Sequence, residues 1–327
     1  MDESPGPLPA QPAQPNPTAP PRLKVGVVGT GRAGSVLGAA LARAGHPVVA
    51  ASAVSDLSRL RAEALLPGTP LVSVPEVFAA ADLVLLTVPD DALTELVAGL
   101  AATEAIRPGQ FVAHASGRYG IGVLDPVTDR GALPLALHPA MTLTGTSLDL
   151  ERLSGAPFGV TAPEVLRPVA EALVVEMGGE PVWVPEQHRA LYHAALANGA
   201  NHLVALVATS LDLLRHADVQ DPQRLLGPLL VAALDNSLRD GDRALTGPVA
   251  RGDAGSVAAH VAAIGEVSVE ARRAYVAMAR LTADRALANG MLRAEAAEVL
   301  LGVLGDDHLR QAPGPGRPAD EEGTEGD

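Results

Sequence analysis

The sequence predicts an α/β domain built on a doubly wound, mainly parallel sheet, followed by an all-α domain. Up to residue 185, short apolar runs alternate with helical patterns, which is typical of strand–helix–strand units. From Glu186 onward, only helical patterns remain. A third observation is a G-x-G-x-x-G spacing between the first apolar run and the first helical pattern. Together these features predict a nucleotide-binding sheet followed by a helical domain.

The first apolar run, Leu23–Val28, ends at this glycine-rich turn, and a helical pattern follows over 35–44. In such a turn, the first glycine permits the tight bend, the second lets the backbone approach a pyrophosphate, and the third allows helix and strand to pack closely. The free N–H groups at the helix N-terminus then face the phosphates. We therefore expect a dinucleotide to bind at Gly29, Thr30, Gly31, Arg32, Ala33 and Gly34.

The second predicted strand, 47–53, bears on the choice of cofactor. In NAD-binding proteins, an acidic residue at the end of this strand binds the ribose hydroxyls, but the sequence has no Asp or Glu between Gly34 and Ser55. Ser52 and Arg59 are candidate donors for a 2′-phosphate, so the sequence favours NADP. NAD remains an alternative because Asp56 lies in the same loop, and Arg59 could equally belong to a solvated helix face.

The next elements are a weak strand over 70–74, a short helix over 75–81, a buried strand over 82–88 and a helix from about 90 to 105. Val88, Pro89 and Asp90 lie where the buried strand ends, which is where such sheets hold the ribose of a cofactor. Asp90 could instead serve only as a helix cap.

Two further strands, 110–115 and 133–137, deliver polar residues to the same edge of the sheet. The first ends in His114-Ala-Ser116-Gly, and the second in His138-Pro-Ala-Met. Open α/β sheets bind ligands at the carboxyl ends of their strands, so Ser116 and His138 are candidate catalytic residues. The alternatives are that Ser116 begins a turn and that His138 is a core histidine.

Two short strands, 156–161 and 180–184, surround a helix over 163–178 and end the first domain. The remaining helices are predicted at 186–216, 222–239, 254–264, 267–289 and 293–304. The first of them has an uncharged stretch, 190–211, that is long enough to span a bilayer. Its polar residues favour a buried helix of a soluble domain, and His193, Asn198 and Asn201 could face one cleft. A buried structural network is the alternative.

Arg251 follows a helix break at Thr246-Gly-Pro and is our candidate for binding a substrate carboxylate, because a guanidinium group binds carboxylates with two hydrogen bonds. The alternative is an ion pair with Asp253. The domain limits that follow are a disordered Pro-rich leader at 1–21, the NAD(P)-binding domain at 22–185, a helical domain for substrate binding and dimerisation at 186–310, and a disordered acidic tail at 311–327.

Composition restricts the chemistry. The chain has 327 residues, no cysteine and a formal net charge of −14, so thiol chemistry is excluded and neither nucleic acid nor an anionic membrane is an expected partner. The sequence suggests no metal site and is consistent with a cytoplasmic protein. Its single lysine, Lys24, begins the first strand. Proton transfer must therefore use histidine, tyrosine, a carboxylate or water.

These motifs together, above all Leu-Thr-Gly-Pro-Val-Ala-Arg-Gly-Asp at 245–253, resemble a bacterial group of predicted oxidoreductases. The group joins a Rossmann-like domain to a C-terminal helical domain of unknown function and includes the alternative ketopantoate reductases. The helical half is also similar to that of 6-phosphogluconate dehydrogenase-like enzymes, in which a lysine supplies the proton. His193 occupies a comparable place. Prephenate dehydrogenases pair a serine with a histidine of an His-Pro motif, and Ser116 and His138 are similar in order and spacing.

The resemblances imply an NADP-dependent oxidoreductase acting on a small 2-oxo or 2-hydroxy acid such as ketopantoate. The long uncharged stretch 190–211 is hard to cover within one small helical domain, which predicts a homodimer through the helical halves. His138, with a pKa near its ordinary value of about 6.5, would exchange the proton, Ser116 would orient the substrate, and His193 is the rival proton donor. Asn198, Asn201 and Arg251 would hold the carboxylate. The alternatives are a prephenate dehydrogenase-like enzyme and a non-catalytic NAD(P)-binding regulator.

Overall fold

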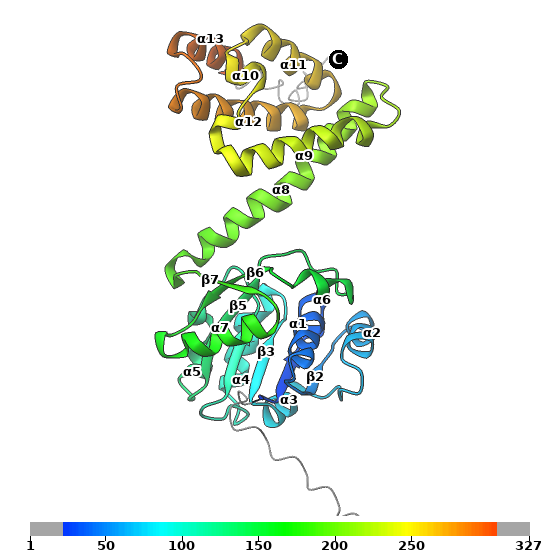
Figure 1. Cartoon of the computed structure of the whole chain (residues 1–327), viewed down its shortest axis with the longest axis vertical. Helices are drawn as coiled ribbons and strands as arrows, with labels where there is room; N and C mark the ends of the chain where they lie inside the picture. The colour runs from blue at the N-terminus through cyan, green and yellow to red at the C-terminus, as the bar shows by residue number, and fades with distance from the viewer. Residues whose placement is uncertain (1–21, 306–327) are drawn as a thin grey trace, which may run out of the picture. The chain divides into compact units, whose positions relative to one another are not determined.

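The computed structural model describes residues 22–305. The predicted leader, 1–21, and the predicted tail, 311–327, lie outside the described residues, as do residues 306–310 of the predicted helical domain. The N-terminal part of the chain forms a seven-stranded sheet in the order β2-β1-β3-β4-β5-β6-β7 (Figure 1). All neighbouring strands are parallel except β5 and β6. The strands are β1 (Val25–Val28), β2 (Val48–Ser52), β3 (Leu83–Leu86), β4 (Phe111–His114), β5 (Leu133–Pro139), β6 (Pro157–Thr161) and β7 (Glu180–Trp183).

Helices cover both faces of this sheet, which is why its central strands are apolar throughout. On one face, α1 (Arg32–Arg43) and α7 (Arg167–Glu176) pack on alternate strand residues such as Val27 and Leu85. On the other face, α3 (Val74–Ala80), α4 (Asp90–Ala101) and α5 (Asp125–Thr128) pack on residues such as Val84 and Val112. The predicted doubly wound α/β architecture is confirmed.

One predicted strand is wrong. Residues 70–74 form only an isolated bridge, in which Leu71 pairs with Ala51. The chain turns into α3 immediately afterwards, because Ser73 and Glu76 form a capping box and Pro75 occupies the first turn. Shorter helices that the pattern did not resolve include η1 (Ile121–Leu124), α6 (Leu148–Arg152), η2 (Glu164–Leu166) and η3 (Glu186–His188).

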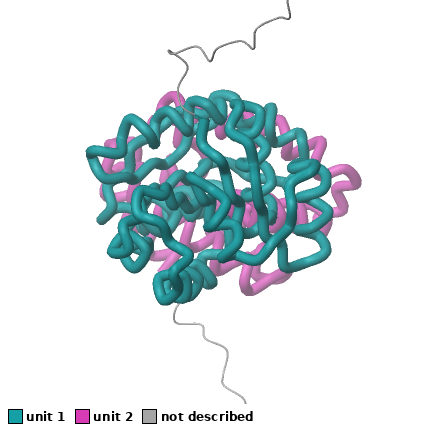
Figure 2. The backbone as a smooth tube through the Cα atoms, turned by 90° about the horizontal axis from the view of Figure 1, so that it is seen from below, with its two compact units in different colours: residues 1–200 teal, residues 201–327 magenta. Residues whose placement is uncertain are grey.

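The chain divides into two compact units, residues 1–200 and 201–327, which Figure 2 distinguishes by colour. The division falls inside α8 (Arg189–His216), followed by α9 (Pro222–Asp240) and η4 (Gly241–Ala244). The core of the second unit is formed by α10 (Gly247–Arg251), α11 (Ala254–Val267), α12 (Val269–Ala288) and α13 (Ala294–Gly305). The predicted all-α C-terminal half is confirmed.

Helix α8 differs from the sequence-based expectation. Glu186–His216 is long and apolar enough to cross a membrane by length and composition, but none of its most apolar window is buried within the chain. The expectation of a buried helix is therefore wrong for this single chain. Several of its apolar side chains are exposed, among them Leu203, Val204 and Leu206, and α9 likewise exposes Leu225, Leu229, Val231 and Leu234.

Candidate functional site

The glycine-rich turn has the geometry of an anion cradle. Gly29 has φ of 91°, a conformation that side chains rarely adopt, and a Cβ on Gly34 would collide with the Gly29 carbonyl oxygen and the Thr87 hydroxyl. Gly31 differs, because a Cβ there would meet nothing within 4 Å. Gly31 is also the N-cap of α1, and no side chain caps the helix. The open space and the uncapped N–H groups at Gly31 fit a pyrophosphate.

Three residues around this turn have structural contacts. Thr30 is fully buried and donates its hydroxyl proton to the Ser58 carbonyl oxygen at 3.0 Å. The Ser52 hydroxyl accepts from the Gly29 N–H at 3.3 Å. Arg59 is exposed and lies 3.6 Å from the Asp56 carboxylate. Thr30 and Ser52 therefore fix the shape of the cradle. Arg59 forms an ion pair with Asp56, the acidic residue that leaves NAD as an alternative cofactor.

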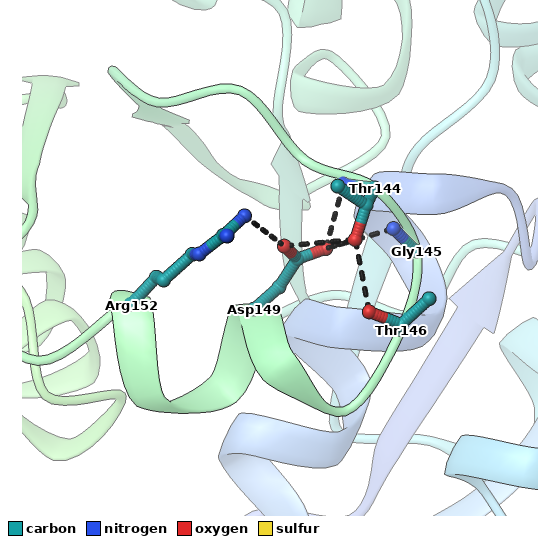
Figure 3. A network of polar contacts seen from close by, with 5 residues as sticks. All are labelled: Thr144, Gly145, Thr146, Asp149 and Arg152. Atoms are coloured by element: carbon teal, nitrogen blue, oxygen red, sulfur yellow. Dashed lines mark hydrogen bonds and ion pairs between the residues drawn. The ribbon is translucent and has the colours of Figure 1, made fainter.

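The loop after β5 contacts the cradle, a feature that sequence reasoning missed. Figure 3 shows the fully buried Asp149 accepting hydrogen bonds from the Thr144 and Gly145 backbone N–H groups, both at 2.7 Å. The bonds from Thr144 and Gly145 lower the pKa of Asp149, although burial opposes them. This holds Gly145 so close to Arg32 of α1 and to Arg61 that a Cβ there would lie 3.0 Å from Arg32 Cγ and 2.7 Å from Arg61 Nε. The Thr-Gly-Thr-Ser-x-Asp pattern was the available signal.

The predicted histidines come together with a tyrosine at the carboxyl end of β5. His138 Nδ1 lies 2.9 Å from the Tyr192 hydroxyl, and the His138 and His193 ring centres are 6.2 Å apart, edge to face. Gly117 makes room for both rings, because a Cβ there would lie 2.8 Å from His138 Nε2 and 2.7 Å from His193 Cδ2. The structure thus places His138, His193 and Tyr192 in one cluster within the first unit.

Arg189 supports this cluster from inside the fold. It is 2% exposed, its Nε donates to Thr161 at 2.9 Å, and its Nη2 donates to the carbonyl oxygens of Ala136 and Gly159. Its Nη1 is buried without a hydrogen-bond partner among the described residues. The guanidinium carbon lies 5.7 Å from the centre of the Tyr192 ring. Sequence reasoning missed Arg189, because an arginine at the start of a helix is usually exposed.

The environment keeps His138 neutral. Burial lowers its pKa to about 4, and the positive charge of Arg189 adds to this effect, whereas Asp90 opposes it. The expectation of a pKa near 6.5 is therefore wrong, because the sequence could not reveal that a buried cation lies beside the imidazole. At neutral pH, His138 carries one ring proton and no net charge.

Ser116 and His114 have structural contacts. The Ser116 hydroxyl oxygen accepts the backbone N–H groups of Arg118 and Tyr119, each at 3.2 Å, and the Ser116 N–H donates to His114 Nδ1. His114 Nε2 lies 2.7 Å from the Gly120 carbonyl oxygen, and burial lowers the His114 pKa to about 4. Both residues thus stabilise the loop that carries Gly117.

The remaining predicted site residues are distributed over the two units. Pro89 is the N-cap of α4 and Asp90 lies in its first turn, directly after Val88 at the end of β3. Asn198 lies on α8 within the first unit. Asn201 and Arg251 belong to the second unit, where Arg251 ends α10 and contributes to the lowered pKa of Asp253. Within residues 22–305, no group of three or more His, Asp or Glu side chains could hold a metal ion.

Comparisons with known proteins agree with this architecture. Residues 10–139 match the Rossmann-like domain, and residues 156–282 match a domain of unknown function, DUF2520. No curated protein matches the sequence.

Solved structures resemble most of the chain at low sequence identity. A predicted NADP oxidoreductase of Bacteroides fragilis has a TM-score of 0.68 and 18% identity over 80% of this chain and 98% of its own. A Thermotoga maritima protein has a TM-score of 0.57 and 22% identity over 81% and 99%. A reductive aminase of Aspergillus terreus, solved with NADPH and ethyl levulinate, has a TM-score of 0.60 and 18% identity over 86% and 99%. At these identities the likeness establishes the fold.

Proposed function

We propose that this chain, which joins a Rossmann-like domain to a DUF2520 domain, is an NADP-dependent oxidoreductase of small 2-oxo or 2-hydroxy acids. The observation that carries the proposal is the cradle at Gly31, where an uncapped helix N-terminus faces open space beside the buried sheet. The NADPH bound to the structurally similar reductase of Aspergillus terreus supports the same cofactor. We further propose a cytoplasmic enzyme with ketopantoate as its substrate.

In this proposal, the cofactor supplies or accepts a hydride at the substrate carbon that carries the oxygen. The cluster of His138, Tyr192 and His193 lies at the carboxyl end of β5, the edge of the sheet at which the cradle also lies. His138 exchanges the proton with the substrate oxygen, and Gly117 keeps its Nε2 edge free of a neighbouring Cβ. We assign substrate orientation to Ser116 and carboxylate binding to Asn198, both of which belong to the first unit with His138. The assignment of Asn201 and Arg251 to carboxylate binding rests on the sequence alone.

The first testable consequence concerns the choice of cofactor. No acidic residue follows β2 before Asp56, and Asp56 is paired with Arg59, so a 2′-phosphate would meet no unpaired carboxylate there. We expect NADPH to bind at least about tenfold more tightly than NADH, which corresponds to roughly 1.4 kcal/mol. Titration calorimetry with both cofactors under one buffer condition measures this ratio. Equal dissociation constants for the two cofactors, or tighter binding of NADH, would contradict the assignment of NADP as the cofactor.

We also propose that the protein is a homodimer assembled through α8 and α9. Both helices expose apolar side chains along their length, and exposed apolar surface of this extent marks an interaction site. A second copy is the simplest partner, because a two-fold axis lets the same surface cover itself.

Light scattering at micromolar concentration is expected to give twice the chain mass, and the double variant Val204→Glu, Leu229→Glu should give the monomer mass. Val204 is 70% exposed and Leu229 is 65% exposed, so the charges disturb no core of the isolated chain. Val165→Glu is the matched control, since Val165 is 84% exposed on η2 and should leave the mass unchanged. A wild-type protein of monomer mass would refute the dimer.

A further inference from the structure

Arg189 is a buried cation whose described hydrogen bonds are all made to neutral oxygens. Its partners are the Thr161 hydroxyl and the carbonyl oxygens of Ala136 and Gly159, and Nη1 has none. Burying a charge is costly unless an opposite charge compensates it. Burial lowers the pKa of Arg189, and the negative charges that Tyr192 and Glu186 carry when ionised oppose this fall. The guanidinium carbon of Arg189 lies 5.7 Å from the centre of the ring of Tyr192, the residue bonded to His138.

The Tyr192 hydroxyl can acquire that negative charge by losing its proton to His138. The structure gives this oxygen one side-chain neighbour, His138 Nδ1 at 2.9 Å. Gly159 on β6 leaves room for the hydroxyl, because a Cβ there would collide with the Tyr192 oxygen. Burial raises the pKa of Tyr192, and the positive charge of Arg189 opposes this rise. A positive charge beside His138 disfavours the imidazolium, so the imidazole is neutral. The tautomer that carries its proton on Nε2 can accept the hydroxyl proton at Nδ1, and the relay proposed below uses this tautomer.

We propose that Tyr192 is the second proton carrier of the site: its hydroxyl replaces, at Nδ1, the proton that His138 delivers from Nε2, and Arg189 stabilises the phenolate that results. This inference rests on the proposed oxidoreductase function. It assigns a role to Arg189, for which the sequence motifs suggested none, and makes Tyr192 the partner of His138 in proton transfer.

In the direction of carbonyl reduction, hydride adds to the carbonyl carbon and the carbon–oxygen π electrons move to the oxygen. The oxygen then takes the proton from His138 Nε2. Nδ1 takes the proton of the Tyr192 hydroxyl, so the imidazole stays neutral and the negative charge rests on Tyr192 beside Arg189. After the product leaves, water protonates Nε2 and the Nδ1 proton returns to Tyr192. One proton from water is consumed for each hydride transferred.

The tautomer of His138 tests this arrangement without any substrate. A two-bond ¹H–¹⁵N spectrum of protein labelled at histidine, with the His138 signals identified by their loss in His138→Asn, reports which ring nitrogen carries the proton. At pH 7 we expect a neutral His138 protonated on Nε2, with Nδ1 as the acceptor. In Tyr192→Phe, the Nδ1 resonance should shift and the preference for Nε2 protonation should weaken. Protonation on Nδ1, or a spectrum unaffected by Tyr192→Phe, would overturn the proposal.

Kinetics test the relay itself. Tyr192→Phe should lower kcat at least about tenfold with the KM and the NADPH dissociation constant within about twofold of wild type, and it should cost little further activity in the His138→Asn background. The chain offers a matched control, because the hydroxyl of Tyr275, on α12 in the second unit, lies at the same 2.9 Å from His260 Nδ1 and belongs to no proposed site. Tyr275→Phe should leave kcat unchanged.

These readouts separate the proposal from the function on which it rests. A wild-type enzyme that is active and insensitive to Tyr192→Phe would refute the relay and leave the oxidoreductase assignment intact. If the wild type reduces no 2-oxo acid, the proposed function fails, and the ¹⁵N spectrum still decides whether Tyr192 donates to His138. A thermal melt of Tyr192→Phe distinguishes either result from misfolding.

Discussion

Replacing Gly31 by valine should abolish binding of NADPH and NADH while the fold remains intact. The variant side chain would occupy the open space at the N-terminus of α1, where a Cβ meets no protein atom within 4 Å and a pyrophosphate would otherwise lie. Gly31 has φ of −72°, which valine adopts without strain, so the loss of stability should stay within about 1 kcal/mol, the range of N-cap changes. We expect the dissociation constants to rise at least about 100-fold, or roughly 2.8 kcal/mol, by fluorescence titration.

Gly34→Ala is the control variant. A side chain at Gly34 would enter space that protein atoms occupy, whereas a side chain at Gly31 would enter space that is open for a ligand. A Cβ on Gly34 would collide with the Gly29 carbonyl oxygen and the Thr87 hydroxyl, so the strand and helix would have to move apart. This variant should lose about 1–3 kcal/mol of stability, the typical cost of overpacking. If Gly31→Val binds both cofactors as tightly as wild type, the glycine turn has only a structural role.

His138→Asn should lower kcat by about 10²–10⁴-fold, the usual contribution of general acid–base catalysis, with NADPH affinity unchanged. Asparagine keeps a polar side chain of similar reach but cannot pass a proton between Tyr192 and the substrate. Because the pKa of His138 is lowered to about 4, the neutral form predominates above that pH. Protonation of His138 should therefore reduce kcat only as the pH falls toward 4, and a step near pH 6.5 would have to come from another group.

His193→Asn is the comparison variant for the same experiment. His193 lies edge to face with His138 but makes no hydrogen bond to it among the described contacts, so we expect a smaller effect, mainly on KM. The opposite pattern, a large fall in kcat for His193→Asn and a small one for His138→Asn, would assign the proton transfer to α8.

Local patterns were sufficient to predict most of the fold. The buried strands β1, β3 and β5 are apolar on both faces because helices cover both sides of the sheet, and such runs are easily recognised. The segment 70–74 was misassigned because apolar residues near a proline resemble a strand, whereas the capping box of α3 decides its structure. The burial of α8 was also wrong. The apolar composition of α8 indicates that another surface packs on the helix. Composition does not specify whether that surface belongs to the same chain.

The site was predicted less completely, because it depends on contacts between distant residues. His138 and His193 could be found from their positions after a strand and on a helix, and the structure brings them together. The pKa of His138 is lowered mainly by burial and further by the charge of Arg189, which is 51 positions away in the sequence and buried by β5 and β6. Likewise, the bond from Gly145 to Asp149 is local, but only the fold brings Gly145 next to Arg32, which is distant in the sequence.

We propose above all that this protein transfers hydride from NADPH to a small 2-oxo acid. The most direct measurement follows the nicotinamide absorbance of NADPH mixed with the purified full-length protein and a panel of 2-oxo acids that includes ketopantoate. We expect consumption of NADPH that requires both the acid and the protein, and that is lost in Gly31→Val. Tight binding of NADPH without consumption across the whole panel would contradict it and favour a cofactor-binding regulator.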